Sequence, residues 1–418
     1  MKAMTRTSAR SRIVIGGAAA IALLISFVTA VVGQEDPLPH PTGRYPVGRT
    51  SFDWTDNNRV DLENANGRRE IVVWVWYPAE QAGPQRAEWA PGLWGNLFAA
   101  AITSQPAPGK SADKVDMKAI RAYACNDVPL AANQNKYPVL IFAPGYGSAP
   151  IEYTALMEDL ASRGYIVAGV TPTYFTTYTV FSDGRIAGQH PMAREVAGAP
   201  RSAWADGSLL PSGDPAPISD AVFRLWTGDL RFCLDQLVQL NATGTSKFRG
   251  HLDLNRVGAF GHSIGAMATA QFAKDDARVG AALLIEGPLM GDVARDPVIA
   301  KPLMVMLAST QKGRDRASLP NRGVSTDVVA LVRSGRPSYV VTVPQSSHPF
   351  PSDIALMPFA TGRHDPNPLR SLTITRAYSA AFFDQHLLGR TSPLLGGPSA
   401  EYPDVLLEHS IVPKPKAP

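Results

Sequence analysis

The stretch "GAFGHSIGAM", residues 258 to 267, surrounds one serine with residues that have small side chains. Gly261 and Gly265 flank Ser263, and glycines at these positions allow a tight turn between a strand and a helix with the serine exposed at its apex. The preceding "NRVGAF" is typical of a short buried strand, and the following "IGAMATAQFAKDD" has apolar residues at helical spacing. The stretch predicts an α/β fold with Ser263 as a candidate nucleophile, although an ordinary tight turn would also fit this pattern.

Further strands and helices alternate along the chain. Several of the predicted strands are apolar throughout, which is typical of central parallel strands that are covered on both faces. The order predicts a mainly parallel sheet with helices on both faces. The predicted strands are 69–80, 137–145, 164–172, 256–261, 280–288, 301–309 and 338–345, and the predicted helices are 151–164, 218–241, 264–276 and 372–389.

Two long segments interrupt this alternation. Residues 81–112 contain three large aromatic side chains, and residues 173–217 are rich in Gly, Ala, Pro and Ser. The second segment follows the carboxyl end of a strand, which is the side of an open α/β sheet where ligands bind. We therefore expect 173–217 to be an inserted, lid-like segment, with packed irregular coverings as the alternative interpretation of both segments.

The N-terminus has the composition of a targeting segment. An uninterrupted apolar run from residue 13 to 33 follows four basic residues, Lys2, Arg6, Arg10 and Arg12. This pattern predicts either an export signal or an N-terminal membrane anchor, so the rest of the chain is expected outside the cytoplasm. Residues 34–418 are expected to form a single catalytic domain, with a frayed tail at 410–418.

Composition excludes several classes of protein. The chain has 45% hydrophobic and 18% charged residues, as a folded globular protein does, and the four basic residues of the leader account for its formal charge of +4. Because no basic patch with interleaved aromatics remains, we expect no nucleic-acid partner. The eight histidines and two cysteines form no metal-ligand pattern, so we expect no metal or other cofactor. Cys125 and Cys233 either pair as a disulfide or remain buried thiols.

A serine nucleophile needs a base and hydrogen-bond donors for the oxyanion, and the chain contains candidates for both. The loop "FAPGYGS", residues 142–148, follows a strand directly and would place the amide of Tyr146 beside that of Ile264, the residue after the nucleophile. His348 in "VPQSSHPFPSD" lies in a loop after the last well-predicted strand and is the expected base. His262 is expected to point away from Ser263.

The acid that would orient the base has more than one candidate. Glu286 ends the apolar run "GAALLIE", whereas Asp315 lies in the Lys- and Arg-bearing loop "STQKGRD" and Asp292 lies between them. A carboxylate at the end of an apolar strand is costly to bury without a partner, while one in a charged loop is simply solvated. This contrast favours Glu286, with Asp315 as the alternative and a structural salt bridge as the other interpretation of Glu286.

These motifs resemble those of the platelet-activating-factor acetylhydrolase family of α/β-hydrolases and, more distantly, cutinase-like polyesterases. The matching stretches span roughly residues 43–390 and are "GRYPVGRTSF", "VLIFAPGYGS", "LASRGYIVAGV", "GAFGHSIGA" and "SSHPFPSD". The resemblance implies an α/β-hydrolase fold and an acid at Glu286. The chain departs from the family at Pro144, where the family usually has His, and at Ala266, where a second Gly is common.

Together these features predict an exported, serine-dependent carboxylic ester hydrolase that works through an acyl-enzyme. The expected partner is a small-molecule or lipid ester, with membrane association through the N-terminal segment if that segment is retained. Two alternatives remain open at the level of sequence. One is an acyltransferase that uses the same residues, and the other is a catalytically silent binding protein on the same fold. The oligomeric state is left open.

Overall fold

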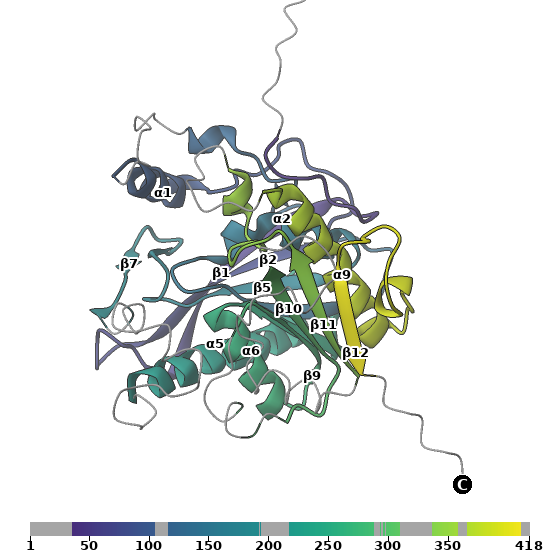
Figure 1. Cartoon of the computed structure of the whole chain (residues 1–418). Coiled ribbons are helices and arrows are strands. Elements are labelled where there is room, and N and C mark those ends of the chain that lie inside the picture. The colour runs from purple at the N-terminus through teal and green to yellow at the C-terminus, as the bar shows by residue number, and fades with distance from the viewer. Residues whose placement is uncertain are drawn as a thin grey trace, which may run out of the picture. The chain divides into compact units, whose positions relative to one another are not determined.

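A ten-stranded mixed sheet forms the centre of the unit Asp36–Pro418 (Figure 1). The computed structural model describes residues 36–104, 116–191, 193, 217–287, 293, 296, 298–309, 337–357 and 366–410. In spatial order the strands are β12 (Leu406–Ser410), β11 (Ser338–Pro344), β10 (Leu303–Ser309), β9 (Val279–Ile285), β8 (Leu252–His262), β4 (Tyr137–Ala143), β5 (Ile166–Thr171), β2 (Arg68–Pro78), β1 (Val47–Val60) and β3 (Cys125–Asn126).

The six strands from β5 to β11 run parallel to one another. Every residue of β4, β5 and β11 is buried, because helices cover both faces of the sheet. Such strands are uniformly apolar rather than alternating. The predicted strands that correspond to them therefore lie where the sequence places them, and the prediction of an α/β fold with a mainly parallel sheet is confirmed.

Antiparallel pairs lie near both edges of the sheet, and their strands β1 and β12 were not predicted. Strand β1 pairs with β2, and β12 pairs with β11, both in antiparallel register. In the middle of β1, the exposed Ser51, Asp53 and Thr55 alternate with the partly buried Phe52 and Trp54, so the apolar runs that mark the inner strands are missing. Ser410 is the last residue of β12 and lies opposite Ser338. Residues 411–418 lie outside the described part of the chain.

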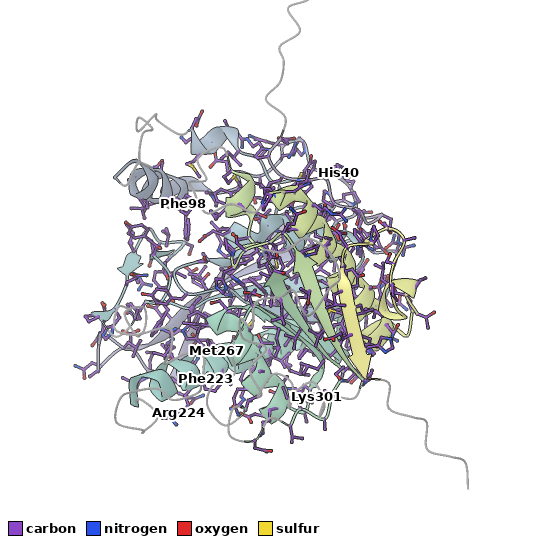
Figure 2. The ribbon with its side chains drawn as sticks, in the orientation of Figure 1. His40, Phe98, Phe223, Arg224, Met267 and Lys301 are labelled. Carbon is purple, nitrogen blue, oxygen red and sulfur yellow. The ribbon has the colours of Figure 1, made fainter. Side chains whose placement is uncertain are left out.

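Helices lie on both faces of the sheet (Figure 1). On one face, α5 (Pro217–Ala242) and α6 (Ile264–Asp275) share a hydrophobic cluster with the sheet, and Phe223 and Met267 of this cluster are marked in Figure 2. On the other face, α2 (Thr154–Ser162) and α9 (Pro368–Leu388) form a second cluster. Short 3-10 helices occupy Met117–Ala119, Pro150–Tyr153, Asp353–Leu356 and Pro393–Leu395.

The two long segments are partly regular. Residues 92–104 form helix α1 (Gly92–Ser104). The indole of the buried Trp89 donates a hydrogen bond to Asp353 Oδ2 at 2.9 Å, so this aromatic is structural. The start of 173–217 contains a hairpin of β6 (Tyr178–Val180) and β7 (Ile186–Gly188). Residues 194–216 of the predicted lid-like segment lie outside the described residues.

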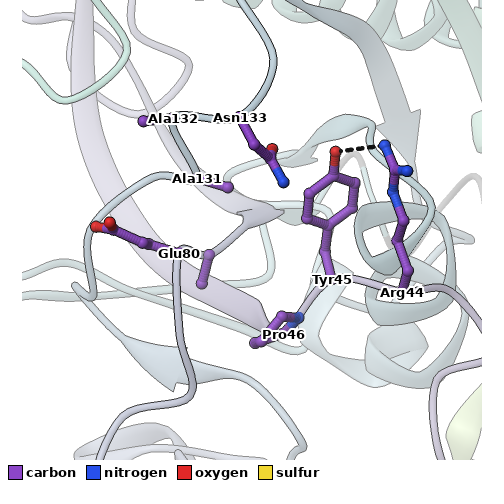
Figure 3. Close-up of a pocket in the computed structure, with 8 residues that line it drawn as sticks. Arg44, Tyr45, Pro46, Glu80, Ala131, Ala132 and Asn133 are labelled. Carbon is purple, nitrogen blue, oxygen red and sulfur yellow. Dashed lines mark hydrogen bonds between the residues drawn. The ribbon is translucent and has the colours of Figure 1, made fainter.

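The two cysteines of the chain do not form a disulfide. Cys125 and Cys233 are both buried free thiols, which is the second of the two alternatives for this pair. Within the described ranges, no helix is long and apolar enough to cross a membrane, and no group of His, Cys, Asp and Glu could hold a metal ion. A cavity of about 290 Å³ beside Tyr45, Glu80 and Asn133 has neither Ser263 nor His348 in its lining (Figure 3).

Candidate active site

Ser263 occupies a sharp turn between β8 and α6. Its backbone has φ 56° and ψ −123°, a conformation that costs free energy for any residue with a side chain. A Cβ atom on Gly265 would overlap the carbonyl oxygens of Ala143 and Pro144, and one on Gly261 would overlap the backbone of Gly265. The two glycines therefore let helix α6 approach the end of β4 closely, while Ser263 projects from the apex.

His348 lies next to this serine. Its loop follows β11, and its Nε2 atom is 3.0 Å from Ser263 Oγ, so the hydroxyl can donate a hydrogen bond to the unprotonated nitrogen. The His348 side chain is 54% exposed, which leaves its ring accessible from solvent. This geometry suits proton transfer from the serine to the imidazole.

Glu286 lies on the other side of the His348 ring. It follows β9 directly with φ 50°, and its Oε2 is 3.4 Å from His348 Nδ1. Its Oε1 accepts a hydrogen bond from the backbone amide of Ala308 on β10, which fixes the orientation of the carboxylate. No arginine pairs with Glu286 among the residues that the structure describes. The alternative acid Asp315, like Asp292, lies outside those residues.

The loop after β4 begins next to the start of helix α6, because Gly265 packs against the carbonyl oxygens of Ala143 and Pro144. Gly147, with φ 80°, forms a bridge to Thr176: its amide donates to Phe175 O at 2.9 Å, and its carbonyl accepts from both Thr177 N and Thr177 Oγ1 at 2.9 Å. The amide of Ile264 is the first of helix α6 and has no acceptor within the helix. The fold thus brings the Tyr146 loop and the start of α6 to the same edge of the sheet.

This edge is where the chain order of the parallel strands reverses. From β4 the chain passes to β5 on one side, and then returns to β8 on the other. Ligands of open α/β sheets bind in the crevice outside the carboxyl ends of such neighbouring strands. The loop after β4 and the turn after β8 flank that crevice, and Glu286 and the His348 loop follow β9 and β11 at the same edge.

Two residues at this edge had no predicted role. His262, which is buried, has its Nδ1 2.8 Å from the hydroxyl of Tyr153 and its Nε2 2.8 Å from the carbonyl oxygen of His348. Its ring centroid is 4.7 Å from that of His348. Burial lowers the pKa of His262 well below its usual value, so this ring is neutral. Nothing in the sequence marks Tyr153 as its partner, because 109 residues separate the two.

A family model and two named proteins are similar in sequence to this chain. The family model for platelet-activating factor acetylhydrolase, isoform II, matches residues 30–173, which include β4 and the Tyr146 loop. A protein from Arthroderma benhamiae described as a probable 1-alkyl-2-acetylglycerophosphocholine esterase is 23% identical over 412 residues, covering 92% of this chain and 97% of that protein. The platelet-activating factor acetylhydrolase of Cavia porcellus is 24% identical over 283 residues, covering 62% of this chain and 57% of that protein.

A solved structure extends the similarity to the fold. The ferulic acid esterase from Streptomyces cinnamoneus superposes with a TM-score of 0.68 at 27% sequence identity, covering 88% of this chain and 98% of that one. All of these relatives are named as esterases or acetylhydrolases. The predicted α/β-hydrolase fold and the predicted resemblance are both confirmed. The chain is a carboxylic ester hydrolase with an α/β-hydrolase fold, and it resembles the platelet-activating factor acetylhydrolases.

Proposed function

We propose that this protein hydrolyses carboxylic esters through an acyl-enzyme formed on Ser263. The observation that carries the proposal is the continuous contact from Ser263 Oγ to His348 Nε2 at 3.0 Å and from His348 Nδ1 to Glu286 Oε2 at 3.4 Å. Hydrogen bonds of this kind are often long before substrate binds and tighten in the reactive complex. The three side chains come from turns after three different strands of one sheet, as in other serine hydrolases.

In the first half-reaction, Ser263 Oγ attacks the ester carbonyl carbon while His348 takes the hydroxyl proton. His348 then gives this proton to the departing alcohol, which leaves the acyl group on the serine. In the second half-reaction, His348 takes a proton from water as the water oxygen attacks the acyl carbonyl carbon. The bond from that carbon to Ser263 Oγ then breaks, His348 returns the proton to Ser263 Oγ, and the carboxylic acid is released. Glu286 holds the imidazole so that Nε2 faces the serine, and its charge stabilises the imidazolium.

The amides of Tyr146 and Ile264 are proposed to hold the oxyanion that forms in both steps. Support comes from their placement on the two sides of the β4–β8 crevice and from the position of Ile264 at the N-terminus of α6, where the helix dipole favours negative charge. Removing one such donor from a serine hydrolase costs roughly 3 to 4 kcal/mol of transition-state stabilisation. No step in this mechanism requires a metal or cofactor.

The substrate class that the relatives favour is an ester with a short acyl group. One relative is named for an acetyl ester of a glycerophosphocholine and another is named platelet-activating factor acetylhydrolase, whereas the structural relative is named for ferulic acid, whose acyl group is larger. We therefore propose short-acyl esters, including acetyl esters of lipids, as substrates of this chain. Transfer of the acyl group to an alcohol would use the same residues, and it differs from hydrolysis only in whether water reaches the acyl-enzyme.

Export is part of the same proposal. The basic residues before position 13 and the apolar run 13–33 support delivery of the catalytic domain out of the cytoplasm, with the run either cleaved or kept as an anchor. Expression in a bacterial host followed by fractionation and N-terminal sequencing of the product distinguishes these outcomes. A full-length product in the cytoplasm would contradict export.

Labelling and a substrate panel test the proposed chemistry. A fluorophosphonate probe should modify Ser263 in the wild type and leave Ser263→Ala unlabelled. The panel compares p-nitrophenyl esters of increasing chain length with a 1-alkyl-2-acetyl-glycerophosphocholine and a feruloyl ester, with and without an added alcohol acceptor. An unlabelled wild type would contradict the serine mechanism, a preference for long acyl chains would contradict the substrate class, and transester formation in place of free acid would identify an acyltransferase.

A further inference from the structure

A buried chain of hydrogen bonds passes from the loop after β4 to the loop that carries His348. It begins at the amide of Gly145, which donates to the hydroxyl oxygen of Tyr153 at 3.2 Å. The Tyr153 hydroxyl is 2.8 Å from His262 Nδ1, and His262 Nε2 is 2.8 Å from the carbonyl oxygen of His348. Tyr153 is 1% exposed and His262 is 4% exposed, so solvent does not compete for these bonds. We call Tyr153 and His262 the bridge pair.

The direction of each hydrogen bond follows from the groups involved. The His348 carbonyl oxygen can only accept, so His262 Nε2 must carry a proton. Because burial keeps the His262 ring neutral, its Nδ1 is then unprotonated and accepts the hydroxyl proton of Tyr153, while the Tyr153 oxygen accepts from the Gly145 amide. Burial lowers the pKa of His262 and raises that of Tyr153, so both groups keep this protonation state at neutral pH. Of the two neutral tautomers of His262, only the one with its proton on Nε2 satisfies both of its contacts.

The bridge pair also leaves little room for movement. A Cβ atom on Gly145 would lie 2.9 Å from His262 Nδ1 and 3.3 Å from the Tyr153 hydroxyl oxygen, so the loop backbone rests directly on the pair. The ring centroid of Tyr153 is 4.8 Å from that of Phe142 on β4, which fixes the phenol in the core. The two ends of the bridge pair therefore cannot shift independently.

Each end of the bridge pair is adjacent to a group with a proposed role in catalysis. Gly145 precedes Tyr146, whose amide is the proposed oxyanion donor, and the carbonyl at the other end belongs to His348, the proposed base. Among the described residues, neither Tyr153 nor His262 forms a hydrogen bond with Ser263 Oγ or with the side chain of Glu286. It thus connects the two loops by a route separate from the proposed catalytic contacts.

We propose that Tyr153 and His262 are positioning residues, which hold the oxyanion loop and the base loop in register across Ser263. This proposal rests on the proposed serine mechanism. A displacement of about 1 Å between reacting groups can lower the rate roughly 100-fold. Holding the two loops at a fixed distance therefore keeps the base and the oxyanion donor in position for the reaction. The bridge pair acts on the transition state through two backbone segments, and it makes no contact with the substrate carbonyl itself.

Tyr153→Phe is the most conservative test, because it removes one hydroxyl and keeps the ring. The substitution leaves the Gly145 amide without its acceptor and His262 Nδ1 without its donor. We expect kcat to fall roughly 10- to 100-fold on a p-nitrophenyl ester, with KM changed less than threefold. The double variant with His262→Gln should be hardly slower than the slower single variant, because both residues belong to one chain of bonds.

Tyr137→Phe is a matched control. Tyr137 is a fully buried tyrosine at the opposite end of β4, and its hydroxyl donates to the carbonyl oxygen of Ala131 at 2.8 Å. This variant should lose stability in urea unfolding to a similar degree as Tyr153→Phe while kcat stays at the wild-type value. Equal kcat values for Tyr153→Phe and wild type, or a kcat loss matched by the control, would overturn the positioning role. So would multiplicative losses in the double variant.

A measurement on the unaltered protein tests the same proposal if Tyr153→Phe fails to fold. Histidine labelled with ¹⁵N should show His262 at pH 7 as the neutral tautomer with its proton on Nε2. A proton on Nδ1, or a charged ring, would exclude the bonding scheme. Fluorophosphonate labelling of wild-type Ser263 is run in parallel. Loss of that labelling would refute the serine mechanism, whereas intact labelling with a charged His262 ring or a proton on Nδ1 would refute the bridge pair alone.

Discussion

Replacing Glu286 by Gln should damage catalysis more than the small change in shape suggests. In the wild type, one carboxylate oxygen accepts from the Ala308 amide and the other faces His348 Nδ1. A glutamine has only one oxygen, and the Ala308 amide is a fixed donor, so that oxygen is expected to stay with Ala308. The glutamine NH₂ then points at His348 Nδ1 and favours the tautomer with its proton on Nε2. That proton blocks Nε2 from accepting the proton of Ser263.

The lost charge adds to the tautomer effect. At the observed 3.4 Å, two unit charges attract by about 5 kcal/mol at an effective dielectric constant of 20 and by about 1 kcal/mol in bulk water. Because the imidazole is half exposed and the carboxylate mostly buried, the stabilisation of the imidazolium lies between these limits. Together with the wrong tautomer, this predicts that kcat falls by roughly 10²- to 10⁴-fold, with a much smaller change in KM.

Steady-state kinetics with p-nitrophenyl acetate measures this effect, with circular dichroism as the check on folding. Asp315→Asn is the control, since Asp315 was the alternative acid, and it should stay near the wild-type rate. A Glu286→Gln variant within a few-fold of wild type, or a larger loss in Asp315→Asn, would refute the assignment. The acid would then have to follow β10 instead of β9.

Four further changes test other parts of the site. Ser263→Ala should abolish ester hydrolysis while the circular dichroism spectrum is unchanged; substantial turnover would exclude Ser263 as nucleophile. Thr177→Val removes the hydrogen bond from the Thr177 hydroxyl to the Gly147 carbonyl, which is worth about 1 kcal/mol, so kcat should fall roughly fivefold. An unchanged kcat would show that the loop after β4 keeps its position without this hydrogen bond. A short linker in place of residues 194–216 should alter the chain-length profile of p-nitrophenyl esters, whereas a folded variant with the wild-type profile would show that this segment is only a covering. Below about pH 6.5, His262 takes up a proton in the unfolded chain but stays neutral in the folded protein. For each further pH unit of acidification, the free energy of unfolding of the wild type should therefore fall by about 1.4 kcal/mol more than that of His262→Gln. Parallel stability curves in urea unfolding would contradict this last expectation.

The sequence was most informative where one physical requirement dominates. Inner strands such as β4 must be apolar on both faces, and the turn at Ser263 needs small neighbours on both sides, so both could be located from composition alone. Glu286 could be singled out because a carboxylate at the end of an apolar strand needs a partner. The structure places it beside His348, although its catalytic role stays a prediction.

Features that depend on long-range contacts could not be located in this way. Strand β1 carries polar residues on its exposed face, so only its pairing with β2 identifies it as a strand. Trp89 lies in the irregular segment 81–112, and nothing in the sequence indicates that its indole donates to a carboxylate 264 residues away. The bridge pair has the same origin, since Tyr153 and His262 meet only after β4, β8 and the intervening chain have folded.

The bridge between Gly147 and Thr176 has a consequence for how such an enzyme changes over time. The donor loop shares a short ladder of hydrogen bonds with the first residues of the segment that leads away from β5 toward the surface. If this loop holds the oxyanion as proposed, a mutation at Phe175 or Thr177 should also shift the backbone that stabilises charge in the reaction. We then expect laboratory selection for a new ester in residues 173–180 to return variants in which substrate range and turnover have changed together.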